Sequence, residues 1–306
     1  MIQFVSATIN STSETLMINL SQNSMMSSFL RIFESMRLSS KSPKDIETQD
    51  SKLIALKIVE PSSSVLPDTQ QSEIFGVFVF SVVWSFGSVL NHNSRKAFSK
   101  EFKHLCKRTV QLYLRSIHRN ALPSDELSLF EAMFDGKDWR HWLHSEQELT
   151  VKTEGGLEHL VFTTTENIKN NFLLKLLLGH GHSMLLVGHT SSGKNTSIEY
   201  FFNHINSQRY LKTLCSFGSH LNLQDTIAIF ERRIEKQCRS KNSVGPVLGK
   251  ISIVYINDIS MALRDKCHDQ PSLELMRQWF VTGGWHDMRG FKRVEDIAFC
   301  SSCSEA

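Results

Sequence analysis

A single glycine- and lysine-containing loop constrains the fold of this chain more than any other stretch. Gly188 is followed after four residues by Gly193 and Lys194, which is the spacing of a phosphate-binding loop. In such a loop, backbone N–H groups surround the phosphates and the lysine reaches the outer ones. The apolar run Ser183–Val187 precedes the loop, and Thr196–His204 has the pattern of a helix. The sequence therefore predicts a strand, a phosphate loop and a helix whose N-terminus faces the phosphates.

The candidate nucleotide-binding residues belong to this loop and to the first turn after it. They are Gly188, His189, Thr190, Ser191, Ser192, Gly193, Lys194, Asn195 and Thr196, and the candidate ligands are ATP and ADP. The position after the lysine normally carries Ser or Thr, whose hydroxyl binds Mg²⁺. Here that position is Asn195, so we expect the metal site to be impaired.

A second motif has the same kind of substitution. The apolar strand of a phosphate-loop fold usually ends in two acidic residues, one for the Mg²⁺ shell and one to polarise the attacking water. Here Ile253–Ile256 is followed by Asn257 and Asp258. Asp258 remains a weak candidate for the catalytic base, whereas Asn257 and Asn195 are both altered metal positions. We expect doubtful Mg²⁺ binding and no efficient hydrolysis, and two hypotheses stay open: weak nucleotide binding without turnover, or a loop that has lost its ligand.

Alternation of strands and helices continues on both sides of the loop. Downstream, Ile251–Ile256 and Val294–Cys300 read as strands, and Pro271–Phe280 reads as a helix with proline in its first turn. Strands separated by helices imply an α/β fold with a parallel sheet and helices on both faces. We expect this core over residues 158–306.

The N-terminal half has a different organisation. We expect a poorly ordered segment at 1–26, a mainly helical region at 27–120 with a loop at 39–72, and a loop or linker with tryptophans at 121–157. Ile74–Leu90 is an uncharged run that reads as a buried helix; a membrane span is the alternative, but the run is short for one. Trp139 and Trp142 are expected to pin their loop to a domain surface.

Composition narrows the class of protein. The chain has 306 residues, 41% hydrophobic and 21% charged, with a formal charge of +3, which is typical of a globular protein and gives no sign of nucleic-acid binding. The six cysteines are scattered, and no signal peptide is recognisable, so we expect a reducing, cytoplasmic setting. Cys300 and Cys303 have the spacing of a redox or metal pair, but without a second pair we interpret them as structural.

Four stretches carry a family resemblance. In collinear order from residue 27 to 303, they are similar to the end of the second and to the third AAA+ module of axonemal dynein heavy chains. These stretches are Phe78–Gly87, Trp139–Trp142, Phe172–Leu178 and Gln270–Asp287. The resemblance implies an incomplete AAA+ core in a microtubule motor of cilia or flagella, with a structural or regulatory role for this module. Its partners would be other AAA+ modules of the ring and dynein subunits, with microtubules bound only through regions outside this chain, and its location would be the cytoplasmic cytoskeleton and the axoneme.

The chain departs from this family at its nucleotide site. The family's phosphate loop usually reads Gly-Pro-Thr-Gly-Thr-Gly-Lys-Ser/Thr, whereas His189, Ser191 and Asn195 stand here for the proline, a glycine and the hydroxyl residue. The family also continues beyond the last residue of this sequence into a fifth strand and a helical lid. We therefore expect a fragment or truncated product in which Met184–Val187 forms an open sheet edge.

Two other functions remain as alternatives. One is a stand-alone ATPase in which Lys194 binds the phosphates and Asp258 is the base. The other is a membrane-anchored scaffold that uses Ile74–Leu90. Whether the chain is an enzyme by itself is left open, and the substituted metal positions argue against it.

Overall fold

The computed structural model describes residues 20–40, 68–113, 122–144, 164–218, 220–234, 238–240, 243–246, 249–287 and 290–304. The chain forms two compact units, one made of residues 1–151 and 162–168 and the other of residues 152–161 and 169–306.

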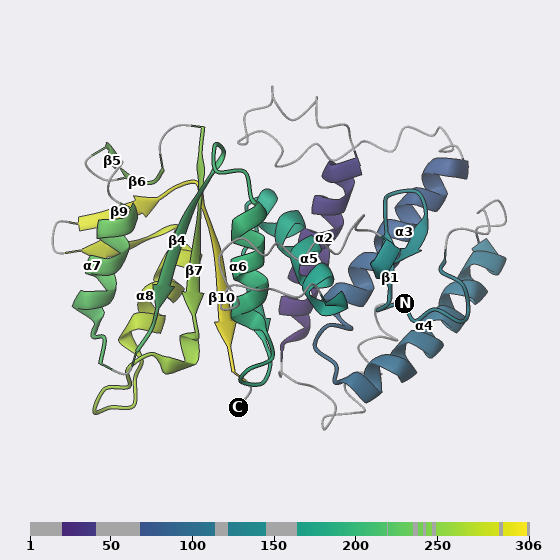
Figure 1. The fold of residues 1–306 in the computed structure, drawn as a ribbon, viewed down its shortest axis with the longest axis horizontal. Helices are drawn as coiled ribbons and strands as arrows, with labels where there is room; N and C mark the ends of the chain where they lie inside the picture. Colours follow the sequence, from purple (N-terminus) through teal and green to yellow (C-terminus); the bar gives the residue numbers. More distant parts are fainter. Residues whose placement is uncertain are drawn as a thin grey trace, which may run out of the picture. The chain divides into compact units, whose positions relative to one another are not determined.

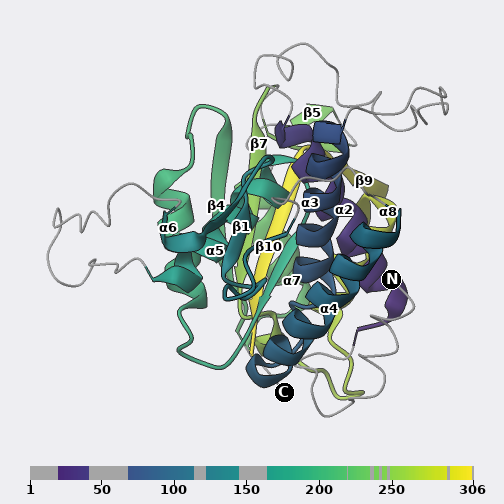
Figure 2. The same ribbon diagram turned by 90° about the vertical axis from the view of Figure 1, so that its right-hand side faces the viewer.

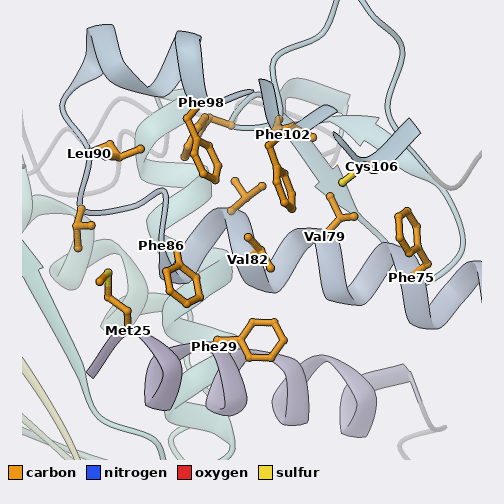
Figure 3. Close-up of a cluster of buried hydrophobic side chains, with 14 residues drawn as sticks. Met25, Phe29, Phe75, Val79, Val82, Phe86, Leu90, Phe98, Phe102 and Cys106 are labelled. Carbon is orange, nitrogen blue, oxygen red and sulfur yellow. The ribbon is translucent and has the colours of Figure 1, made fainter. Parts of the chain in front are cut away.

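The N-terminal unit is built on three helices, α2 (Gln22–Ser40), α3 (Asp68–Ser85) and α4 (His92–Tyr113), which lie next to one another in Figure 2. Their shared core is aromatic and aliphatic. Figure 3 shows Phe29 of α2 on one side of α3, and Phe98 and Phe102 of α4 on the other. Phe102 is completely buried, so α3 is covered along both of these sides.

The uncharged run at 74–90 is a buried element, as predicted. It is helical as far as Ser85, and Val79, Phe80 and Val83 within it are at most 1% exposed. Its apolar residues surround the helix because neighbours cover it on several sides. No helix in the described ranges is both long enough and apolar enough to cross a membrane.

A short hairpin and a single-turn helix complete this unit. The strands β1 (Ala132–Phe134) and β2 (Trp139–His141) pair antiparallel, and η4 covers Trp142–His144. Trp142 is fully buried, with its ring centroid 6.0 Å from that of Trp84 in α3, and its indole N–H donates to the carbonyl of Phe130 at 3.2 Å. The prediction that this tryptophan pins its segment to a domain surface is confirmed.

Three expected boundaries in this unit are wrong where the structure describes them. Helix α2 begins at Gln22, inside the segment expected to be poorly ordered, because Ser21 Oγ accepts from the backbone N–H of Ser24 and caps the helix. Helix α3 begins at Asp68, inside the expected loop. Its first turn is polar, so the apolar pattern used for the prediction starts only later in the helix. The β1–β2 hairpin lies inside the expected linker, because strands of three residues are too short to show alternation. Residues 1–19, 41–67, 121 and 145–157 of these segments lie outside the described residues.

The C-terminal unit is an α/β layer structure. Its main sheet has four parallel strands in the order β3-β10-β7-β4. The elements are α5 (Thr165–Gly179), β3 (Met184–Val187), α6 (Lys194–His204), β4 (Tyr210–Ser216), α7 (Leu223–Ile234), β7 (Ile251–Asn257), η7 (Ile259–Met261), α8 (Pro271–Thr282) and β10 (Ile297–Cys303). This is the α/β fold with flanking helices that the sequence predicts.

Helices cover both faces of the sheet, with α7 and α8 on one face and α5 and α6 on the other (Figure 1). The central strand β7 serves both layers because successive side chains of a strand point to opposite faces. Val254 and Ile256 pack in the cluster with α7 and α8, whereas Ile253 and Tyr255 pack in the cluster with α5 and α6. Because both faces are covered, β7 reads as a continuous apolar run.

A second, smaller sheet is made of β5 (Cys238–Ser240), β6 (Ser243–Val244), β9 (Gly290–Val294) and β8 (Gly284–Asp287), in that spatial order. Trp285 of β8 is fully buried and packs on Trp279 of α8, with 5.7 Å between ring centroids. This contact fixes the hairpin of β8 and β9 to the α7 and α8 side of the unit.

Strand β3 lies at the edge of the described main sheet, as predicted for Met184–Val187. It pairs only with β10 there, from Met184 opposite Cys300 to Val187 opposite Cys303. Leu185 on this edge strand is 48% exposed.

Candidate nucleotide-binding site

Three strands bring the candidate site residues together. In the register of the sheet, the last residue of β3 lies opposite Cys303 at the end of β10, and Ser301 of β10 lies opposite Ile256 of β7. The segments that follow β3 and β7 therefore leave the sheet at the same end. The carboxyl ends of parallel strands are where α/β folds bind their ligands, and the predicted phosphate loop and Asp258 both lie there.

The loop has the backbone of a phosphate-binding loop. Gly188 N–H donates to the carbonyl of Cys303 at 3.3 Å, which ties the loop to β10. Ser191 has φ 63° and Gly193 has φ 80°, so the chain twice enters the left-handed region before α6 begins at Lys194. Left-handed residues turn successive N–H groups toward one concave side, which is the shape that holds an anion. The first N–H groups of α6 have no partner within the helix and add to this donor set.

The side chain of Lys194 folds back over the loop and contacts its backbone. Its Nζ donates to the carbonyl oxygens of Gly188 at 2.7 Å and His189 at 2.6 Å, and lies 3.5 Å from Ser192 Oγ. A side chain at position 188 would approach Ser192 Oγ to 3.1 Å, so glycine keeps this turn tight. The loop shape and the position of the lysine fit a phosphate group. His189, Thr190, Ser191 and Ser192 are exposed at the surface of the loop.

At the expected metal position, protein groups form hydrogen bonds with one another. Asn195 Oδ1 accepts a hydrogen bond from the Tyr255 hydroxyl at 2.6 Å. Ser302 Oγ lies 2.9 Å from the same phenolic oxygen and 3.2 Å from Asn257 Oδ1, and it accepts from the backbone N–H of Asp258 at 2.9 Å. Tyr255 and Ser302 are 3% and 1% exposed.

These residues do not fit a Mg²⁺ shell. Magnesium prefers oxygen ligands in octahedral geometry and is usually held by at least one carboxylate. Neither Asn195 nor Asn257 has a carboxylate, and the Asn195 oxygen already faces a hydroxyl proton. Among the described residues, no group of three or more His, Cys, Asp or Glu side chains could hold a metal ion.

Asp258 directly follows β7, and its backbone is in the left-handed region, with φ 51°. Its carboxylate accepts a hydrogen bond from Ser260 Oγ, which is in turn 3.1 Å from Ser304 Oγ. The structure thus places Asp258 beside the ends of β7 and β10. Its role as a catalytic base stays a prediction.

The two cysteines at the end of β10 do not form a paired site. They are three residues apart on a strand, so their side chains point to opposite faces. Both are free thiols, and burial raises the pKa of the Cys300 thiol to about 12. Cys300 is therefore protonated and packed in the core at neutral pH.

Sequence reasoning missed Tyr255 and Ser302. A signal existed for the tyrosine, because residues two apart on a strand share a face, and Tyr255 stands two residues before Asn257. Ser302 gave no such signal, since its neighbour across the sheet is known only once the register of β10 and β7 is known.

The fold and the loop together define the class of protein: an α/β core of the phosphate-loop type. Comparison with known families is more specific. Residues 149–306 match the model of the P-loop containing dynein motor region, and residues 1–144 match that of the dynein heavy chain AAA lid domain. The chain therefore belongs to the dynein heavy chain family, which confirms the resemblance found in the sequence.

Curated relatives support this membership. The chain is 28% identical over 231 residues to human dynein axonemal heavy chain 3, covering 72% of this chain and 6% of that protein. It is 27% identical over 230 residues to rat dynein axonemal heavy chain 12, covering 71% and 7%, and 27% identical over 242 residues to mouse dynein axonemal heavy chain 1, covering 72% and 6%. The chain spans about 6 to 7% of the length of these relatives.

Proposed function

We propose that this chain forms part of an AAA+ ring of an axonemal dynein heavy chain, spanning the end of the second module and most of the third. In this proposal its loop binds the phosphates of ATP or ADP weakly and without Mg²⁺, and it does not turn the nucleotide over. The module then braces or regulates the ring and does not drive it.

One observation supports the proposal: a loop that keeps its lysine and its left-handed turns stands next to a metal position that has no carboxylate. Lys194 and the left-handed turns at Ser191 and Gly193 supply the cation and the N–H donors that phosphates need. Asn195 and Asn257 supply neither a hydroxyl nor a negative charge for a divalent ion. In this proposal the chain keeps the groups that bind phosphates but lacks those that bind the metal.

The proposed partners follow from family membership. They are the other AAA+ modules of the ring and the other dynein subunits, while microtubules would be contacted by parts of the heavy chain outside this sequence. We propose the cytoskeleton of the axoneme as its location. Neither nucleic acid nor membrane is among the proposed partners.

The test is calorimetric titration of the chain with ATP in the absence of divalent metal. We expect weak binding by the wild type and at least about tenfold weaker binding by Lys194→Ala, since tenfold corresponds to about 1.4 kcal/mol. Lys212→Ala is the matched control, because Lys212 is an exposed lysine on β4, away from the loop. Equal affinity for ATP in the wild type and in Lys194→Ala would contradict a phosphate-binding role for the loop.

The retained Asp258 favours one rival, a stand-alone ATPase. Phosphate release by the purified chain with Mg²⁺ and ATP separates the two proposals. Turnover on the order of 1 per second or more, within the ordinary range of enzymes, would establish the rival. We expect no release above that of Lys194→Ala.

A further inference from the structure

We propose that Tyr255 is a positioning residue that closes the metal position and makes this site select metal-free phosphates. The inference rests on the proposed function, because it concerns the same loop. We call the hydrogen-bonded set of Asn195, Tyr255, Ser302 and Asn257 the hydroxyl bridge. It joins the first turn of α6 to the carboxyl ends of β7 and β10 without a metal ion.

The position of Tyr255 is fixed by the core. It lies on the face of β7 that packs in the cluster with α5 and α6, and its ring meets Phe202 of α6 edge-on, with 6.5 Å between centroids. With 3% of the residue exposed, the ring cannot turn away without opening this layer. The hydroxyl group is therefore held at the start of α6.

The hydroxyl acts there as a proton donor. A phenol has one proton, and the amide oxygen of Asn195 can only accept, so the 2.6 Å contact takes the Tyr255 proton. A tyrosine side chain is neutral at physiological pH, so the hydroxyl keeps this proton. A donor aimed at the only oxygen of the Asn195 side chain opposes coordination of a cation by that oxygen.

Ser302 completes the bridge from the neighbouring strand. Its Oγ accepts from Asp258 N–H, lies 2.9 Å from the phenolic oxygen of Tyr255 and donates its one proton to Asn257 Oδ1. Both residues expected at the metal position thus have partners from within the protein. Rearranging them for a cation would leave the buried Ser302 and Tyr255 hydroxyls short of partners, which is unfavourable.

The first test measures the bridge without any ligand. We would compare the melting temperatures of the full chain, Tyr255→Phe, Asn195→Ala and the double variant. Each single change should lower the melting temperature by roughly 2 to 4 °C. The double variant should melt within about 1 °C of the less stable single variant, because both changes remove the same contact. Additive losses would show that the two side chains do not interact and would overturn the proposal.

Tyr210→Phe is the matched control for this cycle. Tyr210 packs against the same α5 and α6 cluster but lies at the opposite end of the parallel sheet, paired with Ile251 at the start of β7. Its effect should add to that of Asn195→Ala.

The second test measures metal selection. We would titrate the wild type, Tyr255→Phe and Tyr210→Phe with ATP, with and without Mg²⁺. We expect Mg²⁺ to change the affinity of the wild type and Tyr210→Phe by less than about threefold, and to strengthen binding by Tyr255→Phe by about fivefold or more. A Mg²⁺ effect below about threefold in Tyr255→Phe would overturn metal exclusion by this residue. Absence of ATP binding in all three proteins would instead contradict the proposed function, and the melting cycle would still decide whether the bridge exists.

Discussion

Ser191 holds a backbone conformation that glycine adopts freely. Its φ of 63° lies in the left-handed region, where a residue with a side chain is disfavoured by roughly 1 to 2 kcal/mol. The neighbouring turn residue Gly193 has φ 80° and avoids this strain. The loop therefore keeps its shape at position 191 against a local preference.

We expect Ser191→Gly to raise the free energy of unfolding by about 1 kcal/mol, because the relief of strain exceeds the added flexibility of the unfolded chain. Denaturant unfolding measures this change. Ser192→Gly is the control: Ser192 is not among the described residues with positive φ, so glycine there should give no gain. A loss of stability in Ser191→Gly would mean that the left-handed turn is not under strain.

Some residues of the site could be predicted from the sequence, and others could not. Lys194, Gly188 and Gly193 could be assigned from spacing alone, because the loop is a local structure. The partner of Asn195 could not, because Tyr255 is 60 positions away in sequence, and Ser302, which contacts Tyr255, is further still. Their meeting depends on strand order, which no local pattern contains.

At the scale of elements, helix α3 is the centre of the N-terminal unit. Trp84 near its end packs against Phe80, Phe130 and Trp142, with ring centroids 6.0 to 6.2 Å apart. Its indole nitrogen is buried without a hydrogen-bond partner among the described residues. Trp84 therefore stabilises the unit through packing alone.

Replacing Trp84 with Ala should lower the free energy of unfolding by about 3 to 5 kcal/mol, the usual cost of removing a large aromatic side chain from a core. Trp84→Phe should lose much less, since it keeps a ring and removes an unpartnered N–H group. Urea unfolding monitored by circular dichroism measures both. A loss below roughly 1 kcal/mol for the alanine variant would show that α3 is not core at this position.

Elements with a long periodic pattern were predictable, and short ones were not. Helix α8 covers Pro271–Thr282, where the sequence predicted Pro271–Phe280, and β7 covers Ile251–Asn257, where it predicted Ile251–Ile256. The hairpin of β1 and β2 was not predicted, because each strand has only three residues and β1 packs on α3, which is distant in sequence. Tertiary contacts, not local preference, determine such elements.

At the scale of the whole molecule, β3 lies at an edge of the main sheet among the described residues, and we expect this edge to promote association between chains. An exposed strand edge offers unpaired backbone groups to another chain. Leu185 on β3 is 48% exposed and adds an apolar side chain, whereas its neighbour Leu186 is 7% exposed and faces the α5 and α6 layer. The two residues form a natural pair for testing this edge.

Leu185→Lys should reduce aggregation of the purified chain with a change in unfolding free energy within about 0.5 kcal/mol, because a charge on an exposed edge opposes pairing between chains. Leu186→Lys is the contrasting variant and should unfold the C-terminal unit, since it buries an unpaired charge. Light scattering and thermal melting measure the two properties. Equal aggregation of the wild type and Leu185→Lys would rule out this edge as the cause.

In the proposed function the phosphate loop binds nucleotide without a metal, and one measurement tests this most directly. It is the calorimetric affinity for ATP, with and without Mg²⁺, of the wild type and of a double variant carrying Asn195→Thr and Asn257→Asp. These two changes restore a hydroxyl and a carboxylate at the metal position. We predict that Mg²⁺ alters wild-type affinity by less than about threefold, under roughly 1 kcal/mol, and strengthens binding by the double variant by about tenfold or more. Strong Mg²⁺-dependent binding of ATP by the wild type would show that the two asparagines are competent ligands and would contradict the account.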